Sequence, residues 1–213
     1  MESIQKNYTN LINELPKNVT LVAVSKTHSA DKIAAMYDAS CRIFGENKAQ
    51  ELVEKYEALP KDIEWHLIGH LQTNKVKYIA PFVHLIHSID SVKLLQEVDK
   101  RASQNNRVID CLLQVHIAQE ESKFGFSFDE VEEVLRTNHF AHVRICGLMG
   151  MATNTSDQAL IRQEFRSLSN AFQKLKSVHN LTILSMGMSS DYLLAIEEGS
   201  TIIRIGSTLF GKR

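Results

Sequence analysis

The sequence has few of the residues that break, cross-link or anchor a chain. Its 213 residues include three prolines, nine glycines and three cysteines. No apolar run approaches the ~20 residues of a membrane-spanning helix, and no linker-like stretch divides the chain. We therefore expect one domain over residues 1–213 and no membrane partner. A scattered, odd set of cysteines argues against a disulfide framework or zinc cluster, so Cys41, Cys111 and Cys146 should be buried, reduced thiols.

The sequence also lacks an excess of either charge. Lysine and arginine number 24 against 25 acidic residues, which leaves a net charge of −1. A nucleic-acid binder usually shows a basic excess, so no nucleic-acid partner is expected. The first residues lack the apolar segment of a secretory signal, which favours a cytoplasmic protein. The nine histidines show no two-histidine-plus-carboxylate spacing of a familiar metal site, so no metal is expected.

Short apolar runs alternate with longer segments of helical spacing. Most of these runs are apolar throughout, as are parallel strands buried on both faces. They cover residues 20–25, 42–45, 65–69, 83–88, 110–117, 143–148, 182–186 and 201–205. Between them, Phe165, Leu168, Phe172 and Leu175 lie on one helical face. Eight strands alternating with helices predict a single-domain (β/α)8 TIM barrel, and the apolar stripe from Ile4 predicts an extra N-terminal helix.

An open, doubly wound sheet is the alternative fold. That fold usually has a glycine-rich first turn, whereas the first predicted strand here ends in Val24-Ser25-Lys26-Thr27. The barrel is therefore favoured. Two capping-box spacings, Ser127 with Glu130 and Thr155 with Gln158, predict the starts of two helices.

Lys26 is the first candidate for chemistry, because functional groups of such barrels lie at the carboxyl ends of the strands. It follows an apolar run that should be buried. Partial burial lowers the pKa of an amine and frees it to attack a carbonyl. The alternative is a lysine whose chain extends to solvent at a strand end.

A second candidate site follows the last two predicted strands. Gly206 and Ser207 follow the eighth strand and Ser189 follows the seventh, where barrels often bind phosphate through backbone N–H groups. The alternative is an ordinary turn in which serine caps a helix.

An amine, a phosphate-binding turn and an arginine in one barrel mouth suit pyridoxal 5'-phosphate (PLP). Lys26 would form the Schiff base, Ser189, Gly206 and Ser207 would hold the phosphate, and Arg204 would face the ring nitrogen. Arginine cannot accept a proton, so the ring would be a weaker electron sink than with an aspartate partner.

Five segments, in this order and at this spacing, resemble the pyridoxal phosphate homeostasis protein family. They are 23–26 (AVSK), 44–47 (FGEN), 65–75 (WHLIGHLQTNK), 184–189 (LSMGMS) and 204–211 (RIGSTLFG). The resemblance implies a barrel like the N-terminal domain of alanine racemase, with PLP bound as an aldimine to Lys26 and Asn47 lining the pocket. It implies a carrier or buffer of the cofactor that affects amino-acid and keto-acid balance, without an established turnover. Partners would be PLP and apo forms of PLP-dependent enzymes, and a monomer is expected.

Two other functions would fit part of this set of residues. A weak racemase of the alanine racemase type would need a second acid or base opposite Lys26, for which His70 or Tyr192 is available. No second domain follows the barrel in this sequence, which disfavours efficient racemisation. A barrel that binds another phosphorylated ligand non-covalently would keep the Gly206 turn without needing Lys26.

The segment 119–126 after the fifth predicted strand carries a Glu-x-Lys-x-Gly pattern that also resembles the family. Lys123 would contact the cofactor phosphate or a second cofactor molecule. The simpler interpretation is a solvated loop with Phe126 in the core.

Overall fold

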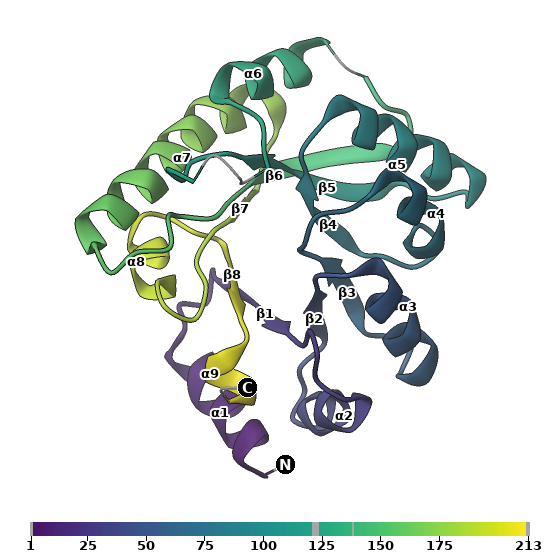
Figure 1. The fold of residues 1–213 in the computed structure, drawn as a ribbon, viewed down its shortest axis with the longest axis vertical. Helices are drawn as coiled ribbons and strands as arrows, with labels where there is room; N and C mark the ends of the chain where they lie inside the picture. The colour runs from purple at the N-terminus through teal and green to yellow at the C-terminus, as the bar shows by residue number, and fades with distance from the viewer. Residues whose placement is uncertain (1, 121–123, 138, 212–213) are drawn as a thin grey trace.

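The computed structural model describes residues 2–120, 124–137 and 139–211. The strands close into one parallel barrel in chain order, β1 to β8, and form the inner ring of Figure 1. They are β1 Thr20–Val24, β2 Ile43–Glu46, β3 Glu64–Leu67, β4 Leu85–Ile89, β5 Ile109–Val115, β6 Val143–Gly150, β7 Ile183–Ser185 and β8 Ile202–Ile205. The predicted (β/α)8 barrel is confirmed and the open sheet is wrong.

Pairing between the first and last strands closes the barrel. Thr20 lies opposite Ile202 and Ala23 lies opposite Ile205, in parallel register. Because the two strands are parallel and paired in register, the residues that follow Ala23 and Ile205 lie next to each other at the carboxyl end of the barrel. Segments from the two ends of the chain therefore share one site.

The helices surround the strands (Figure 1). They are α1 Glu2–Glu14, α2 Ala30–Asp38, α3 Ala49–Ala58, a 3₁₀ turn η1 Thr73–Lys75, α4 Val76–Ile79, α5 Val92–Gln104, α6 Phe128–Thr137, α7 Gln158–His179, α8 Tyr192–Glu197 and α9 Ser207–Phe210. The predicted N-terminal helix is α1, and it lies against α9, where the Asn7 side chain donates to the Leu209 carbonyl at 3.1 Å. Within the described ranges, no helix is long and apolar enough to cross a membrane.

The core has two parts. The larger part lies between strands and helices and includes the fully buried Ile33, Phe165 and Leu168. The smaller part is a separate cluster of residues from β1, β4, β5, β6 and β8: Val22, Leu85, Leu112, Cys146, Met149 and Ile202. All three cysteines are buried and free, as predicted.

One of the two predicted capping boxes is confirmed. The Ser127 N–H donates to Glu130 Oε2 at 2.7 Å, and the Glu130 N–H donates to Ser127 Oγ at 3.3 Å. The box at Thr155 is wrong, because Asp157 caps α7 by accepting from the N–H groups of Ala159 and Leu160. A carboxylate there also meets the positive end of the helix dipole.

Gly147 is required by the closeness of β6 and β7. It lies opposite Ile183 in the β6–β7 ladder, and a Cβ atom there would stand 1.7 Å from the Ile183 carbonyl oxygen.

We expect Gly147→Ala to lower the free energy of unfolding by more than about 3 kcal/mol, because the obstructing atom is backbone. Urea unfolding measures this, with the exposed Ser177→Ala as a control that should change it by less than about 0.5 kcal/mol. Equal stability of the two variants would contradict the described register.

Candidate functional site

A cavity of about 690 Å³ opens at the carboxyl ends of the strands, within the ~300–1,000 Å³ range of small-molecule sites. All the residues predicted for the site line it: Lys26, Asn47, Ser189, Arg204, Gly206 and Ser207. Strands β1, β2, β7 and β8 or the turns after them supply these side chains. The structure therefore brings the whole predicted set together at one mouth.

The half-buried Lys26 follows β1 in a turn whose backbone is held from both sides. Before it, the Ser25 carbonyl accepts from Lys55 Nζ at 2.7 Å, and Ser25 Oγ donates to Glu46 Oε1 at 2.6 Å. After it, the Thr27 N–H donates to Glu51. Thr27 has φ of 65°, a left-handed conformation that persists only where the surroundings enforce it. The turn therefore fixes where the Lys26 side chain starts.

The anchor of this turn is a buried ion pair that the sequence analysis did not find. Lys55 Nζ lies 2.6 Å from Glu46 Oε1 and 2.7 Å from Glu51 Oε1. Burial raises the pKa of Glu46, and hydrogen bonds from Lys55 and Ser25 oppose that rise. The i,i+4 spacing of Glu51 and Lys55 on α3 was the available signal, although such pairs usually lie on exposed faces.

Asn47 is positioned by the close approach of the next strand's end. A Cβ atom on Gly69 would lie 2.5 Å from the Asn47 carbonyl oxygen and 2.7 Å from its Cα. Glycine at position 69 therefore allows the two segments to touch and holds the Asn47 backbone at the cavity wall.

The turns after β7 and β8 form the opposite wall. The Gly206 N–H donates to Ser189 Oγ at 3.2 Å, which ties the two turns together. Ser207 begins α9, and the first N–H groups of a helix have no partner inside it. Hydroxyl and N–H groups that converge in this way suit a phosphate.

Arg204 lies at the base of the cavity and is only 4% exposed. It donates from Nη1 to Ser185 Oγ at 2.6 Å and from Nη2 to the Gly150 carbonyl at 3.1 Å. Burial lowers the pKa of Arg204 to about 10, against an opposing effect of Asp191. The guanidinium therefore remains charged at neutral pH.

A chain of buried polar side chains continues from Arg204 through the barrel. Ser185 Oγ lies 2.9 Å from His87 Nδ1, and His87 Nε2 lies 3.0 Å from His66 Nδ1. Burial lowers the pKa of His66 to about 3 and that of His87 well below its usual value. Both imidazoles are thus neutral, and neither adds a charge beneath Arg204.

The remaining candidates lie elsewhere. Among the described residues that line the cavity, neither His70 nor Tyr192 occurs; His70 instead lies 2.9 Å from Asp90 and stacks on Phe124. Phe126 is buried as expected, whereas Lys123 is outside the described residues. His28, which no sequence pattern identified, also lines the cavity and stacks on Phe210.

Removing the lysine of the buried ion pair should lower stability by an amount that depends on pH. Lys55→Met leaves the Glu46 carboxylate without its cation, so we expect a loss of about 3–5 kcal/mol in the free energy of unfolding near pH 8. In the variant, the folded-state pKa of Glu46 rises further above the unfolded value. A folded state that binds the extra proton gains stability as pH falls, so the loss should shrink near pH 5.

Urea unfolding of both proteins at the two pH values measures this effect. Lys100→Met, which removes an exposed lysine, is the control. A Lys55→Met loss that does not depend on pH would contradict the assignment to Glu46.

A known family and several known proteins match most or all of this chain. The family model for the alanine racemase N-terminal domain matches residues 1–213. The pyridoxal phosphate homeostasis protein of Aquifex aeolicus is 43% identical over 197 residues, covering 91% of this chain and 86% of that protein. The protein of the same name from Synechocystis is 38% identical and covers 97% of each chain.

Solved structures of related proteins have the same fold. PipY of Synechococcus elongatus, solved without PLP, superposes with a TM-score of 0.93 at 36% identity, covering 98% of this chain and all of that one. The same protein with PLP bound gives a TM-score of 0.87. An alanine racemase from Clostridium difficile, at 14% identity and a TM-score of 0.81, shares the fold over 56% of its own length. The chain belongs to the pyridoxal phosphate homeostasis protein family, whose barrel is that of the alanine racemase N-terminal domain.

Proposed function

We propose that this chain binds PLP in the cavity at the barrel mouth and serves PLP homeostasis as a carrier or buffer of the cofactor. One observation carries the proposal: pairing of β1 with β8 puts Lys26 and the Gly206–Ser207 turn in the same cavity, with Arg204 at its base. The PLP bound to PipY, a relative at 36% identity, supports it.

The groups in the cavity match three of the polar groups of PLP: the phosphate, the ring nitrogen and the aldehyde. Ser189 and Ser207 offer hydroxyl groups to the phosphate, and the Gly206 N–H, which donates to Ser189 Oγ, orients the Ser189 hydroxyl. Arg204 offers a charged donor to the ring nitrogen, and Asn47 lines the wall. Lys26 offers the amine that an aldehyde requires, so the residues present fit the cofactor.

Lys26 is the group that makes the attachment covalent. Its neutral Nζ would hold the aldehyde carbon of PLP through a carbon–nitrogen double bond, with the aldehyde oxygen released as water. When bound, PLP supplies an electron sink for carbanions of amino acids. Arg204 cannot take up a proton from the ring nitrogen and carries its own charge, so it weakens that sink.

A weak racemase is the second candidate, because the barrel is shared with alanine racemase. That likeness establishes the fold alone. Proton transfer to both faces of an amino acid needs a second acid or base within reach, and the two candidates predicted for that role, His70 and Tyr192, lie outside the cavity lining. We therefore favour a non-enzymatic role. A monomeric state, a cytoplasmic location and transfer to apo-enzymes stay predictions.

The test compares wild type, Lys26→Ala and the control Lys17→Ala, which removes an exposed lysine before β1. PLP titration should give a visible absorption band in wild type and control and none in Lys26→Ala. We expect at least a tenfold weaker affinity in Lys26→Ala, equivalent to about 1.4 kcal/mol. Pyridoxal, which lacks the phosphate, should bind wild type more weakly than PLP.

Two activity assays on the same proteins separate the roles. Loaded wild type should restore activity to an apo-aminotransferase and should racemise L-alanine no faster than free PLP. Racemisation that disappears in Lys26→Ala would overturn the carrier role in favour of the enzyme. A colourless wild type that binds PLP as tightly as Lys26→Ala would instead indicate a non-covalent phosphate site.

A further inference from the structure

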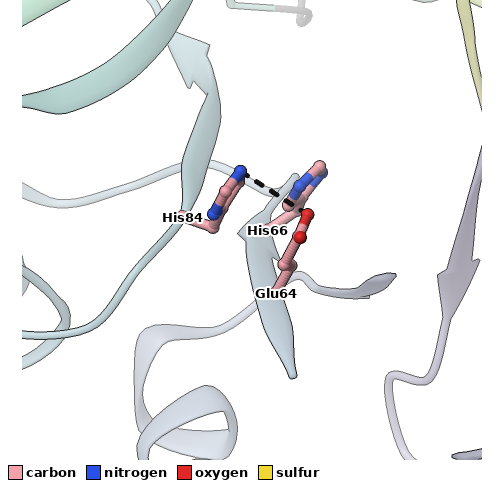
Figure 2. Close-up of side chains that lie close together, drawn as sticks. All are labelled: Glu64, His66 and His84. Atoms are coloured by element: carbon pink, nitrogen blue, oxygen red, sulfur yellow. Dashed lines mark ion pairs between the residues drawn. The ribbon is translucent and has the colours of Figure 1, made fainter. Parts of the chain in front are cut away.

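A second cluster of chemistry-bearing side chains lies at the opposite end of the barrel. Glu64 is the first residue of β3 and His84 directly precedes β4, so both stand at the amino ends of the strands. His66, two residues along β3, shares a strand face with Glu64. One nitrogen or oxygen atom from each of the three side chains lies within 4.8 Å of the other two. Figure 2 shows the three side chains grouped together.

The separation of Glu64 and His84 fits two ligands of one ion. His84 Nε2 lies 3.5 Å from Glu64 Oε2, long for a charge-assisted hydrogen bond. Two ligands bound tetrahedrally at the usual zinc distances stand roughly 3.4 Å apart. Both side chains are about half exposed, so an ion has access from solvent.

His66 has a buried nitrogen atom that lacks a hydrogen-bond partner. Its side chain is buried with 3% exposure, and its Nε2 atom has no hydrogen-bond partner among the described residues. A buried polar atom without a partner costs free energy. A metal ion bound between the three side chains would give that atom a partner.

The other nitrogen of His66 has the contact that metal-binding histidines usually make. His66 Nδ1 lies 3.0 Å from His87 Nε2. In the metal-binding tautomer, His66 Nδ1–H donates to His87 Nε2, and His66 Nε2 presents its lone pair. His87 Nδ1–H then donates to Ser185 Oγ, which also accepts from Arg204. Hydrogen bonds of this kind fix the tautomer and orientation of a ligand.

We propose that Glu64, His66 and His84 bind a divalent transition-metal ion such as Zn²⁺ at the amino-terminal mouth of the barrel. Two imidazoles and a carboxylate suit zinc, and one coordination position remains for water. The His66 and His84 rings lie nearly parallel, with an interplanar angle of 9°. Because a nitrogen lone pair lies in the ring plane, the half-exposed His84 ring turns toward the ion on binding while the buried His66 stays in place.

The test uses PLP-loaded protein freed of metal with a chelator and titrated with Zn²⁺ in a calorimeter. Wild type should bind about one equivalent, and Zn²⁺ should raise its unfolding temperature. Glu64→Gln, which keeps the size of the side chain, and His84→Ala should each weaken binding by at least about tenfold. His139→Ala removes an exposed histidine elsewhere and should bind Zn²⁺ like wild type.

The absorption band of bound PLP and the circular dichroism spectrum report folding in each variant. Both should be unchanged, because the two substituted residues are half exposed and distant from the PLP cavity. Equal Zn²⁺ affinity in wild type, Glu64→Gln and His84→Ala would overturn the proposal, as would the absence of one-to-one binding in wild type. Loss of the PLP band from wild type would concern the function proposed above and not this metal site.

Discussion

Closure of the barrel between β1 and β8 is the constraint on which the site depends. Lys26 and Gly206 are far apart in the chain, and only the parallel pairing of Ala23 with Ile205 makes them neighbours. The same closure brings the turns after β2 and β7 to the cavity. Every functional side chain therefore stands where a strand ends, which is the arrangement that barrels of this kind share.

Buried polar contacts hold the two sides of the cavity in place. On one side, Lys55 donates to the Ser25 carbonyl, and Glu46 accepts from the Ser25 hydroxyl and from Lys55. On the other, Ser185 and the Gly150 carbonyl hold the guanidinium of Arg204. Burying charges is costly unless they are paired and hydrogen-bonded, and here the partners also fix position. The Lys26 backbone and the Arg204 guanidinium thus start from fixed places before any ligand arrives.

Much of the fold and of the site could be predicted from the sequence, because local sequence patterns mark each strand of a barrel. Apolar runs buried on both sides identify the strands, and the residues after each run identify the mouth. Lys26, Ser189, Arg204 and Ser207 could therefore be assigned to one site from the amino-acid sequence. The Thr155 capping box failed because a nearby aspartate competed for the same helix start. Spacing alone does not show which of two nearby capping residues begins the helix.

The contacts that could not be predicted depend on how neighbouring strands and helices align. Lys55 contacts Glu46 only because α3 packs with the Lys55 face toward the barrel. His66 contacts His87 only because of the register between β3 and β4. The grouping of Glu64, His66 and His84 has the same origin, since no familiar ligand spacing connects them in the chain. Register between elements is a property of the packed barrel, and one sequence does not encode it in a readable pattern.

Borohydride reduction of the PLP-loaded protein, followed by proteolysis and mass mapping, identifies the residue that holds PLP. Reduction makes the bond between cofactor and amine permanent, so the modified lysine can be read from peptide masses. We expect one pyridoxyl group per chain, on the peptide that contains Lys26. Adducts spread over surface lysines, or a single adduct on a different lysine, would contradict it.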